Sequence, residues 1–162
     1  MRYSEGPSTR VAADVSAEPE RVWPHVVDLS LLVEASDELQ HAEWVDPDGP
    51  FVGARFLGRN FRHEAGSWET TSTVVECDRP SRFAWAVGDT QEPAALWRFE
   101  LVENDEGTSL SQYVRLGPGP SGLTPMIEAE PEREHEFVTR RLEMLRVGMQ
   151  ATVDLIAARA VE

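Results

Sequence analysis

The residues of this chain that could do chemistry are few and scattered. His63 and Glu64 stand side by side in FRHEAGSWET, and a histidine beside a carboxylate can serve as a general base. Residues 132–135 read Glu-Arg-Glu-His, which matches the Glu-x-x-His pattern of di-iron bundles, but those sites need the pattern twice and two further glutamates. The remaining histidines are isolated, and there is no HExxH motif. We therefore expect no metal ion and no cofactor.

Covalent catalysis has no motif in the sequence either. There is no G-x-S-x-G, and the sequence places no histidine beside the single cysteine, Cys77. All 15 basic residues are arginine, so neither a Schiff-base lysine nor a P-loop lysine is present. The sequence therefore assigns no catalytic residue.

Charge and composition limit the partners of the chain. A net charge of -14 predicts repulsion of polyanions, which argues against nucleic acid and anionic membranes. No apolar run reaches the roughly 18 residues of a membrane helix, and the N-terminus lacks the apolar segment of a signal peptide. A single cysteine fits a reducing compartment. We expect a cytoplasmic monomer or homodimer without membrane insertion, in which residues 1–162 form one domain with a core at about 9–157.

Patterning along the chain predicts an α+β protein. A first helical region follows residue 18, and Pro24 should bend it into two short pieces. The stretch GPGPSGLTP, residues 117–125, is too rich in glycine and proline for a regular element and predicts a loop. From about 131 to 160 the apolar residues share one arc of a long helix. Alternation predicts strands at 9–17, 39–45, 53–61, 67–77, 82–88, 95–103 and 108–116.

Several weak motifs in this order resemble one known superfamily. They are VAADVSAEPERVW followed by Asp28, then GARF with GRN, ECDRPSRFAW, WRFEL and GTSL. The chain is similar in these to the SRPBCC superfamily, which includes START lipid-transfer domains and polyketide cyclase/dehydrase-like proteins. The resemblance implies a helix-grip fold: a curved seven-stranded antiparallel sheet wraps the C-terminal helix, with two short helices between strands 1 and 2. It also implies an apolar cavity between sheet and helix. Pro24 departs from the pattern of the superfamily.

Within such a cavity, parity along the strands selects the candidate site. Trp68, Trp85 and Trp97 lie in three different predicted strands, where they would either fill the core or line a pocket. The inward face of residues 67–77 is left open by the pattern. In residues 53–61 the two arginines, Arg55 and Arg59, share one parity and indicate the solvent face. Asn60 has the other parity, so it turns inward or else caps a bulge. The candidate ligand-binding residues are Asn60, Trp68, Thr70, Trp85, Trp97, Phe99, Gln112, Phe137, Arg141 and Leu145.

Two polar members of this set have specific alternatives. Gln112 shares a face with Leu110 and Val114, so its amide needs a partner, and a protein group or a water is the simpler expectation than a ligand. Arg141 lies at the edge of the apolar arc, where it could bind a ligand oxygen, although pairing with one of the 29 acids is the simpler expectation.

Three functions follow from these residues and the resemblance. The preferred one is a binding or carrier protein for a small hydrophobic or aromatic molecule, with GPGPSGLTP as a gate. The alternative is a cyclase/dehydrase-like enzyme, in which Gln112, Asn60 and Arg141 polarise carbonyls and a histidine or glutamate at the mouth is the base, with His63 as the candidate. The third is a protein-interaction or stress-response module. Because HEAG separates two predicted strands and Gly66 suits a turn, His63 and Glu64 are more simply an exposed hairpin tip.

Overall fold

The computed structural model describes all residues from 1 to 162 and contains one antiparallel sheet of seven strands. The order across the sheet is β1-β7-β6-β5-β4-β3-β2. Every predicted strand is present, and its ends differ from the prediction by at most two residues. The strands are β1 (Ser8–Val15), β2 (Leu39–Trp44), β3 (Arg55–Arg62), β4 (Gly66–Asp78), β5 (Arg82–Val87), β6 (Ala95–Asn104) and β7 (Gly107–Leu116).

Four helices accompany the sheet, with single 3-10 turns at Tyr3–Glu5 and Pro131–Arg133. They are α1 (Pro19–Val26), α2 (Leu29–Ala35), α3 (Leu123–Ala129) and α4 (Glu134–Ala160). The two short helices between β1 and β2 confirm the prediction, but the reason given for them was wrong. Pro24 lies inside α1. The break falls at Asp28, whose carboxylate accepts a hydrogen bond from the N–H of Ser30 at 3.0 Å and so caps the start of α2.

The loop predicted for GPGPSGLTP is correct only in its first part. Residues 123–125 already belong to α3, where Ser121 Oγ accepts the N–H of Leu123 at 3.2 Å. The preceding glycine-rich part is anchored, because the Gly119 carbonyl accepts the Tyr3 hydroxyl at 2.6 Å. The Gly119 N–H donates to the Pro93 carbonyl at 2.9 Å, and a Cβ at Gly119 would collide with the Glu92 carbonyl oxygen. Packing therefore fixes the middle of this loop.

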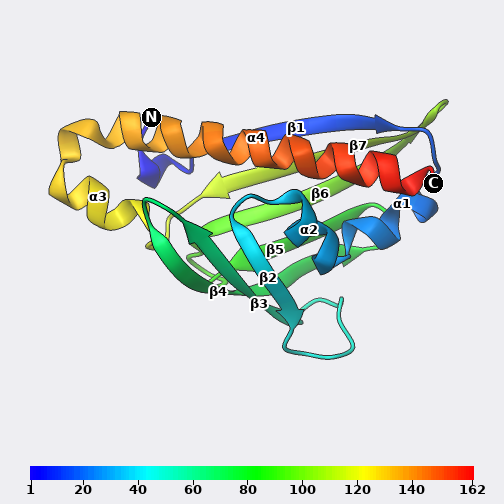
Figure 1. Cartoon of the computed structure of the whole chain (residues 1–162), viewed down its shortest axis with the longest axis horizontal. Coiled ribbons are helices and arrows are strands. Elements are labelled where there is room, and N and C mark those ends of the chain that lie inside the picture. Colours follow the sequence, from blue (N-terminus) through cyan, green and yellow to red (C-terminus); the bar gives the residue numbers. More distant parts are fainter.

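The helices lie on one face of the sheet (Figure 1). In that view α4 runs beside β1 along one margin, α1 and α2 lie nearer its C-terminal end, and α3 lies at its N-terminal end. We call the face of the sheet turned toward α4 the inner face. Cross-strand pairs place the following side chains on it: Val11, Phe56, Asn60, Trp68, Thr70, Val74, Phe83, Trp85, Trp97, Phe99, Leu110, Gln112 and Val114. This arrangement is the helix-grip fold that the resemblance implies.

The apolar arc of α4 packs onto this inner face as predicted. Val138, Leu142, Met149 and Ile156 are buried, whereas Leu145 is half-buried. They join a single cluster of 29 buried apolar residues, which explains why a helix of low overall hydropathy stays in place. None of the helices is long and apolar enough to span a membrane.

Candidate functional site

The half of the inner face nearer α1 is closely packed by aromatic rings. Trp85 stands at its centre, only 6% exposed, with its ring centroid 5.5 Å from that of Phe83 and 5.7 Å from that of Phe56. The rings of Trp97 and Phe99 both lie 6.0 Å away from it. Such tilted, edge-on and stacked contacts are the preferred geometries of aromatic pairs. Trp85 and Phe99 of the predicted set therefore lie in the core.

The other half of the inner face is less completely covered. Asn60 pairs with Trp68 across the β3–β4 hairpin, so both share the inner face, and Thr70 follows Trp68 on it. This settles which side of residues 67–77 turns inward. These three side chains are only half-buried, and so are Trp97 on β6, which stacks on Trp85 of the packed half, and Leu145 on α4. We call these five residues the half-buried end of the inner face.

Gln112 is the largest of the buried polar side chains of the sheet. It is 3% exposed, and its side-chain Oε1 is buried without any hydrogen-bond partner. Its direct cross-strand neighbours are Phe99 and Val11, and Trp97 is the diagonal neighbour on β6. By contrast, Thr108 on the same face of β7 donates its hydroxyl to the Ala17 carbonyl at 2.7 Å. Of the two buried polar side chains on this face of β7, Thr108 is thus paired, whereas the Oε1 of Gln112 stays unpaired at a cost of about 1–3 kcal/mol.

Arg141 forms an ion pair with a carboxylate, as its simpler interpretation predicts. Its two terminal nitrogens donate to the two oxygens of Glu38 at 2.7 and 2.9 Å, a bidentate arrangement in which the two side chains are 21% and 23% exposed. Glu38 is held in turn by Ser36, whose hydroxyl oxygen accepts the N–H groups of Glu38 and Leu39. Phe137, one turn before Arg141 on α4, is buried, and the Arg133 guanidinium lies 4.7 Å from its ring centroid.

Arg62 joins this site although the sequence prediction omitted it. Its guanidinium Nη1 lies 3.7 Å from Glu38 Oε1, and its carbon Cζ lies 5.9 Å from the centroid of the Trp68 ring. The predicted strand ended at Phe61 or Arg62, and Arg62 was given no role in the site. The signal was present, because Arg62 has the same parity along β3 as Asn60 and therefore turns to the same face.

The histidine of the His63–Glu64 pair lies in the exposed β3–β4 turn. His63 packs edge-on against Phe61 with 5.5 Å between ring centroids, and Gly66 supplies the positive φ of 74° that the turn requires. His63 therefore lies at an exposed hairpin tip, as its simpler interpretation predicts. The role of His63 as a base stays a prediction. No three His, Cys, Asp or Glu side chains come together in a way that could hold a metal ion.

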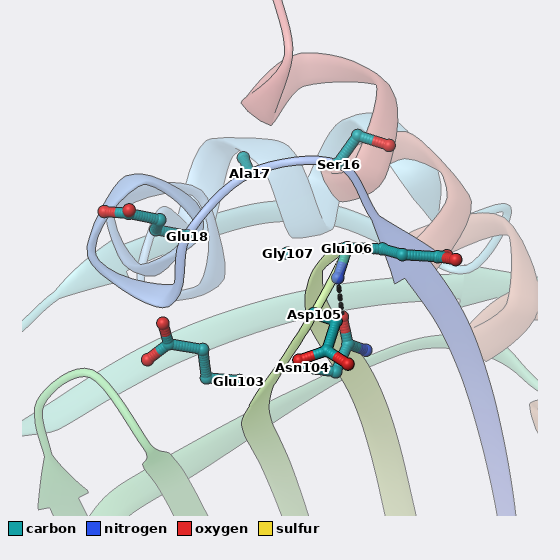
Figure 2. A pocket seen from close by; sticks show the side chains of 8 residues that line it. All are labelled: Ser16, Ala17, Glu18, Glu103, Asn104, Asp105, Glu106 and Gly107. Atoms are coloured by element: carbon teal, nitrogen blue, oxygen red, sulfur yellow. Dashed lines mark hydrogen bonds between the residues drawn. The ribbon is translucent and has the colours of Figure 1, made fainter.

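Two surface pockets lie away from the half-buried end. The first, of about 320 Å³, lies between the β1–α1 turn and the β6–β7 turn and carries the carboxylates of Glu18, Glu103, Asp105 and Glu106. Figure 2 shows that Glu106 points away from Glu18, so these carboxylates do not converge on one point. The second pocket, of about 420 Å³, is lined by Trp23, Pro24, Val27, Pro50, Cys77 and Arg79.

Cys77 in the second pocket is predicted to be a slow nucleophile. Burial raises the pKa of its thiol, and the neighbouring negative charge of Asp78 raises it further, so the reactive thiolate is scarce near neutral pH. We expect iodoacetamide at about pH 7.5 to modify folded protein at least several-fold more slowly than guanidinium-unfolded protein, measured by intact mass. Equal rates in the two states would show that the fold does not suppress this thiol.

Comparison with known proteins agrees with this geometry. The fold is that of the SRPBCC superfamily. Residues 7–148 match the family model described as polyketide cyclase / dehydrase and lipid transport, and the chain belongs to this family. A search of curated proteins found no match.

Solved structures share the fold over nearly the whole chain. The Polyketide_cyc-like protein Cgl2372 from Corynebacterium glutamicum is 25% identical, with a TM-score of 0.66 over 93% of this chain and 88% of that one. The di-domain ARO/CYC proteins BexL, of the BE-7585A biosynthetic pathway, and StfQ, of the steffimycin pathway, are 18% and 13% identical. Their TM-scores are 0.70 and 0.71, covering 96% and 95% of this chain but 50% of each of theirs. At these identities BexL and StfQ are similar in fold alone.

Proposed function

We propose that the protein binds a small, largely apolar molecule between α4 and the half-buried end of the inner face, and that the amide of Gln112 hydrogen-bonds to it. The observation that carries the proposal is the buried Gln112 Oε1, which has no partner in the protein. Evolved proteins seldom keep such a group without a use, because an apolar residue in its place would remove the cost of burying it.

The surroundings of Gln112 fit this role. Small-molecule sites combine a mostly apolar lining with a few polar groups that fix the orientation of the ligand. A primary amide both donates and accepts, so the complementary ligand group is a hydroxyl or a carbonyl. Trp97, the diagonal neighbour of Gln112, belongs to the half-buried end and offers an aromatic surface beside it. Trp85, Phe99 and Phe137 of the predicted set are buried, so in this proposal they support the base of the site and make few contacts with the ligand.

Gly58 offers a direct test of the location. It lies on the inner face of β3, and a Cβ there would approach Thr70 Oγ1 to 2.9 Å and Leu39 Cδ1 to 3.2 Å, both of them side-chain atoms. We expect Gly58→Val to weaken binding of the neutral fluorophore N-phenyl-1-naphthylamine by about tenfold, because the added side chain must displace the Thr70 and Leu39 side chains on the face where we place the ligand. Thr71→Val, which places a valine on the opposite, outer face of β4, should bind like the wild type.

Fluorescence titration measures both variants, and organic extraction followed by mass spectrometry of purified protein searches for a co-purified ligand. Equal affinity of Gly58→Val and wild type would exclude this end of the inner face as the site. Absence of fluorophore binding by the wild type would contradict the proposed function itself.

A cyclase is the second candidate, favoured by the family description and by the ARO/CYC proteins that share the fold. Ring closure needs a shaped pocket, a group that polarises a carbonyl and a base. Gln112 and Asn60 are the polarising groups we propose for this case, since both hydrogen bonds of the Arg141 fork already go to Glu38. Turnover of a poly-carbonyl substrate that falls on His63→Ala would support His63 as the base, and unchanged turnover would remove it.

A further inference from the structure

We propose that Arg62 binds the negatively charged end of the ligand, so that the ligand class is an amphipathic organic anion. This inference rests on the function proposed above and adds to it the chemical class of the ligand. It depends on the half-buried arginine pair at the end of the inner face, and on the one carboxylate between the two arginines.

The hydrogen-bonding capacity of Arg62 is almost unused. A guanidinium carries five N–H donors. The only hydrogen bond that this side chain donates goes to the sulfur of Met144, at 3.7 Å from Nη1, and a thioether is a weak acceptor. Its Nε is buried with no partner, whereas the side chain as a whole keeps 24% of its surface exposed. Arg62 therefore offers donors to an incoming oxyanion at little cost in existing contacts.

Charge at this place also favours an anion. Both oxygens of Glu38 accept hydrogen bonds from Arg141, while Arg62 stays 3.7 Å from the nearer of them. Two guanidinium groups and one carboxylate leave one positive charge in a half-buried place, within a chain of net charge -14. Glu64 approaches Arg62 Nε only to 4.0 Å and is 79% exposed, so solvent screens its charge.

The position of Arg62 links this charge to the apolar part of the site. Arg62 follows Asn60 on the inner face of β3, and its guanidinium lies near the ring of Trp68. An apolar body lying along Trp68 would bring an attached carboxylate, sulfonate or enolate to Arg62. The Arg141–Glu38 pair positions the site, because it ties α4 to the chain segment before β2 and holds Glu38 in its bidentate geometry.

Two fluorophores of the same skeleton test the proposal. They are 8-anilinonaphthalene-1-sulfonate, which carries an anion, and N-phenyl-1-naphthylamine, which lacks it. We expect Arg62→Gln to weaken binding of the sulfonate by about tenfold or more and to leave the neutral compound within about twofold of wild type, since a lost charge-assisted hydrogen bond affects only the anion. The matched control is Arg98→Gln, because Arg98 is also half-buried and pairs with Glu76 at 2.9 Å on the outer face. It removes the same charge and should change neither affinity.

Arg62→Lys and the salt dependence of binding distinguish the charge of Arg62 from a structural role of its side chain. Arg62→Lys keeps the charge and should retain sulfonate binding better than Arg62→Gln. If Arg62→Gln does not fold, Arg62→Lys and the salt dependence of wild-type binding replace it, and only the sulfonate affinity should fall as salt rises. Equal loss of both fluorophores in Arg62→Gln would assign Arg62 a structural role, and unchanged sulfonate affinity would overturn the proposal. With either result, the proposed function still holds if the wild-type protein binds the neutral compound. If the wild-type protein does not bind the neutral compound, the proposed function itself is contradicted.

Discussion

Replacing Trp85 with alanine should destabilise the protein by about 3–5 kcal/mol, the largest effect expected of any single change described for this chain. The Trp85 ring is 6% exposed and contacts the rings of Phe56, Phe83, Trp97 and Phe99, so its removal leaves a cavity that rigid neighbours cannot close. Urea unfolding followed by circular dichroism measures the change, because tryptophan fluorescence itself would be altered.

Trp68 provides the matched comparison. It is also a tryptophan on the inner face, but it is half-buried and belongs to the end where we place the ligand. We expect Trp68→Ala to cost roughly 1 kcal/mol or less in stability and to weaken binding of N-phenyl-1-naphthylamine by about tenfold. This pair of results would separate a core tryptophan from a ligand-lining one. Similar losses of stability in both variants would contradict the division of the inner face into a packed half and a half-buried end.

Replacing Gln112 with leucine should have the opposite sign and stabilise the free protein by about 1–2 kcal/mol. Leucine removes a buried acceptor that has no partner and keeps a similar volume against Phe99 and Val11. If the amide serves a ligand, this gain comes with a loss of recognition. We expect wild-type protein to prefer 1-naphthol over naphthalene, and Gln112→Leu to lose about fivefold or more of that preference in competition with the fluorophore.

Thr108 is the control for this prediction, because it lies on the same face of the same strand and is fully buried. Its hydroxyl is paired, so Thr108→Val should destabilise the protein by about 1–2 kcal/mol by leaving the Ala17 carbonyl without its donor. Thermal unfolding compares the two variants directly. A destabilised Gln112→Leu would show that the amide is satisfied in solution and would remove the observation that carries the proposed function.

The two halves of the inner face differ in how completely their side chains are packed. Near α1, rings fill the space between sheet and helices, and the polar group of Thr108 is paired. Toward the β3–β4 hairpin, side chains are half-buried, and the Nε of Arg62 there is buried without a partner. The second buried polar atom without a partner, Gln112 Oε1, lies on the same face but on β7, beside Phe99 of the packed half. Unpaired polar atoms beside incompletely covered aromatic side chains are the expected signature of a site adapted to a ligand.

The sequence by itself determined the elements and their faces. Strand periodicity is local, so the alternation in residues 82–88 and 95–103 was enough to place Trp85 and Trp97 on one face, where they pair. The apolar arc of residues 131–160 likewise identified the buried side of α4. The whole of α3 was missed, because glycine and proline dominate the residues before it, although proline is well tolerated in a first helical turn.

The tertiary structure alone decided what each polar side chain of the site contacts. Glu38 and Arg141 are 103 positions apart, and no local pattern distinguishes Glu38 among 29 acids as the partner. Likewise, parity turned Gln112 inward but could not show whether its amide found a partner, because that depends on atoms from β1, β6 and α4 brought together by folding. Periodicity fixes the direction of a side chain, while its hydrogen bonds depend on neighbours that are distant in sequence.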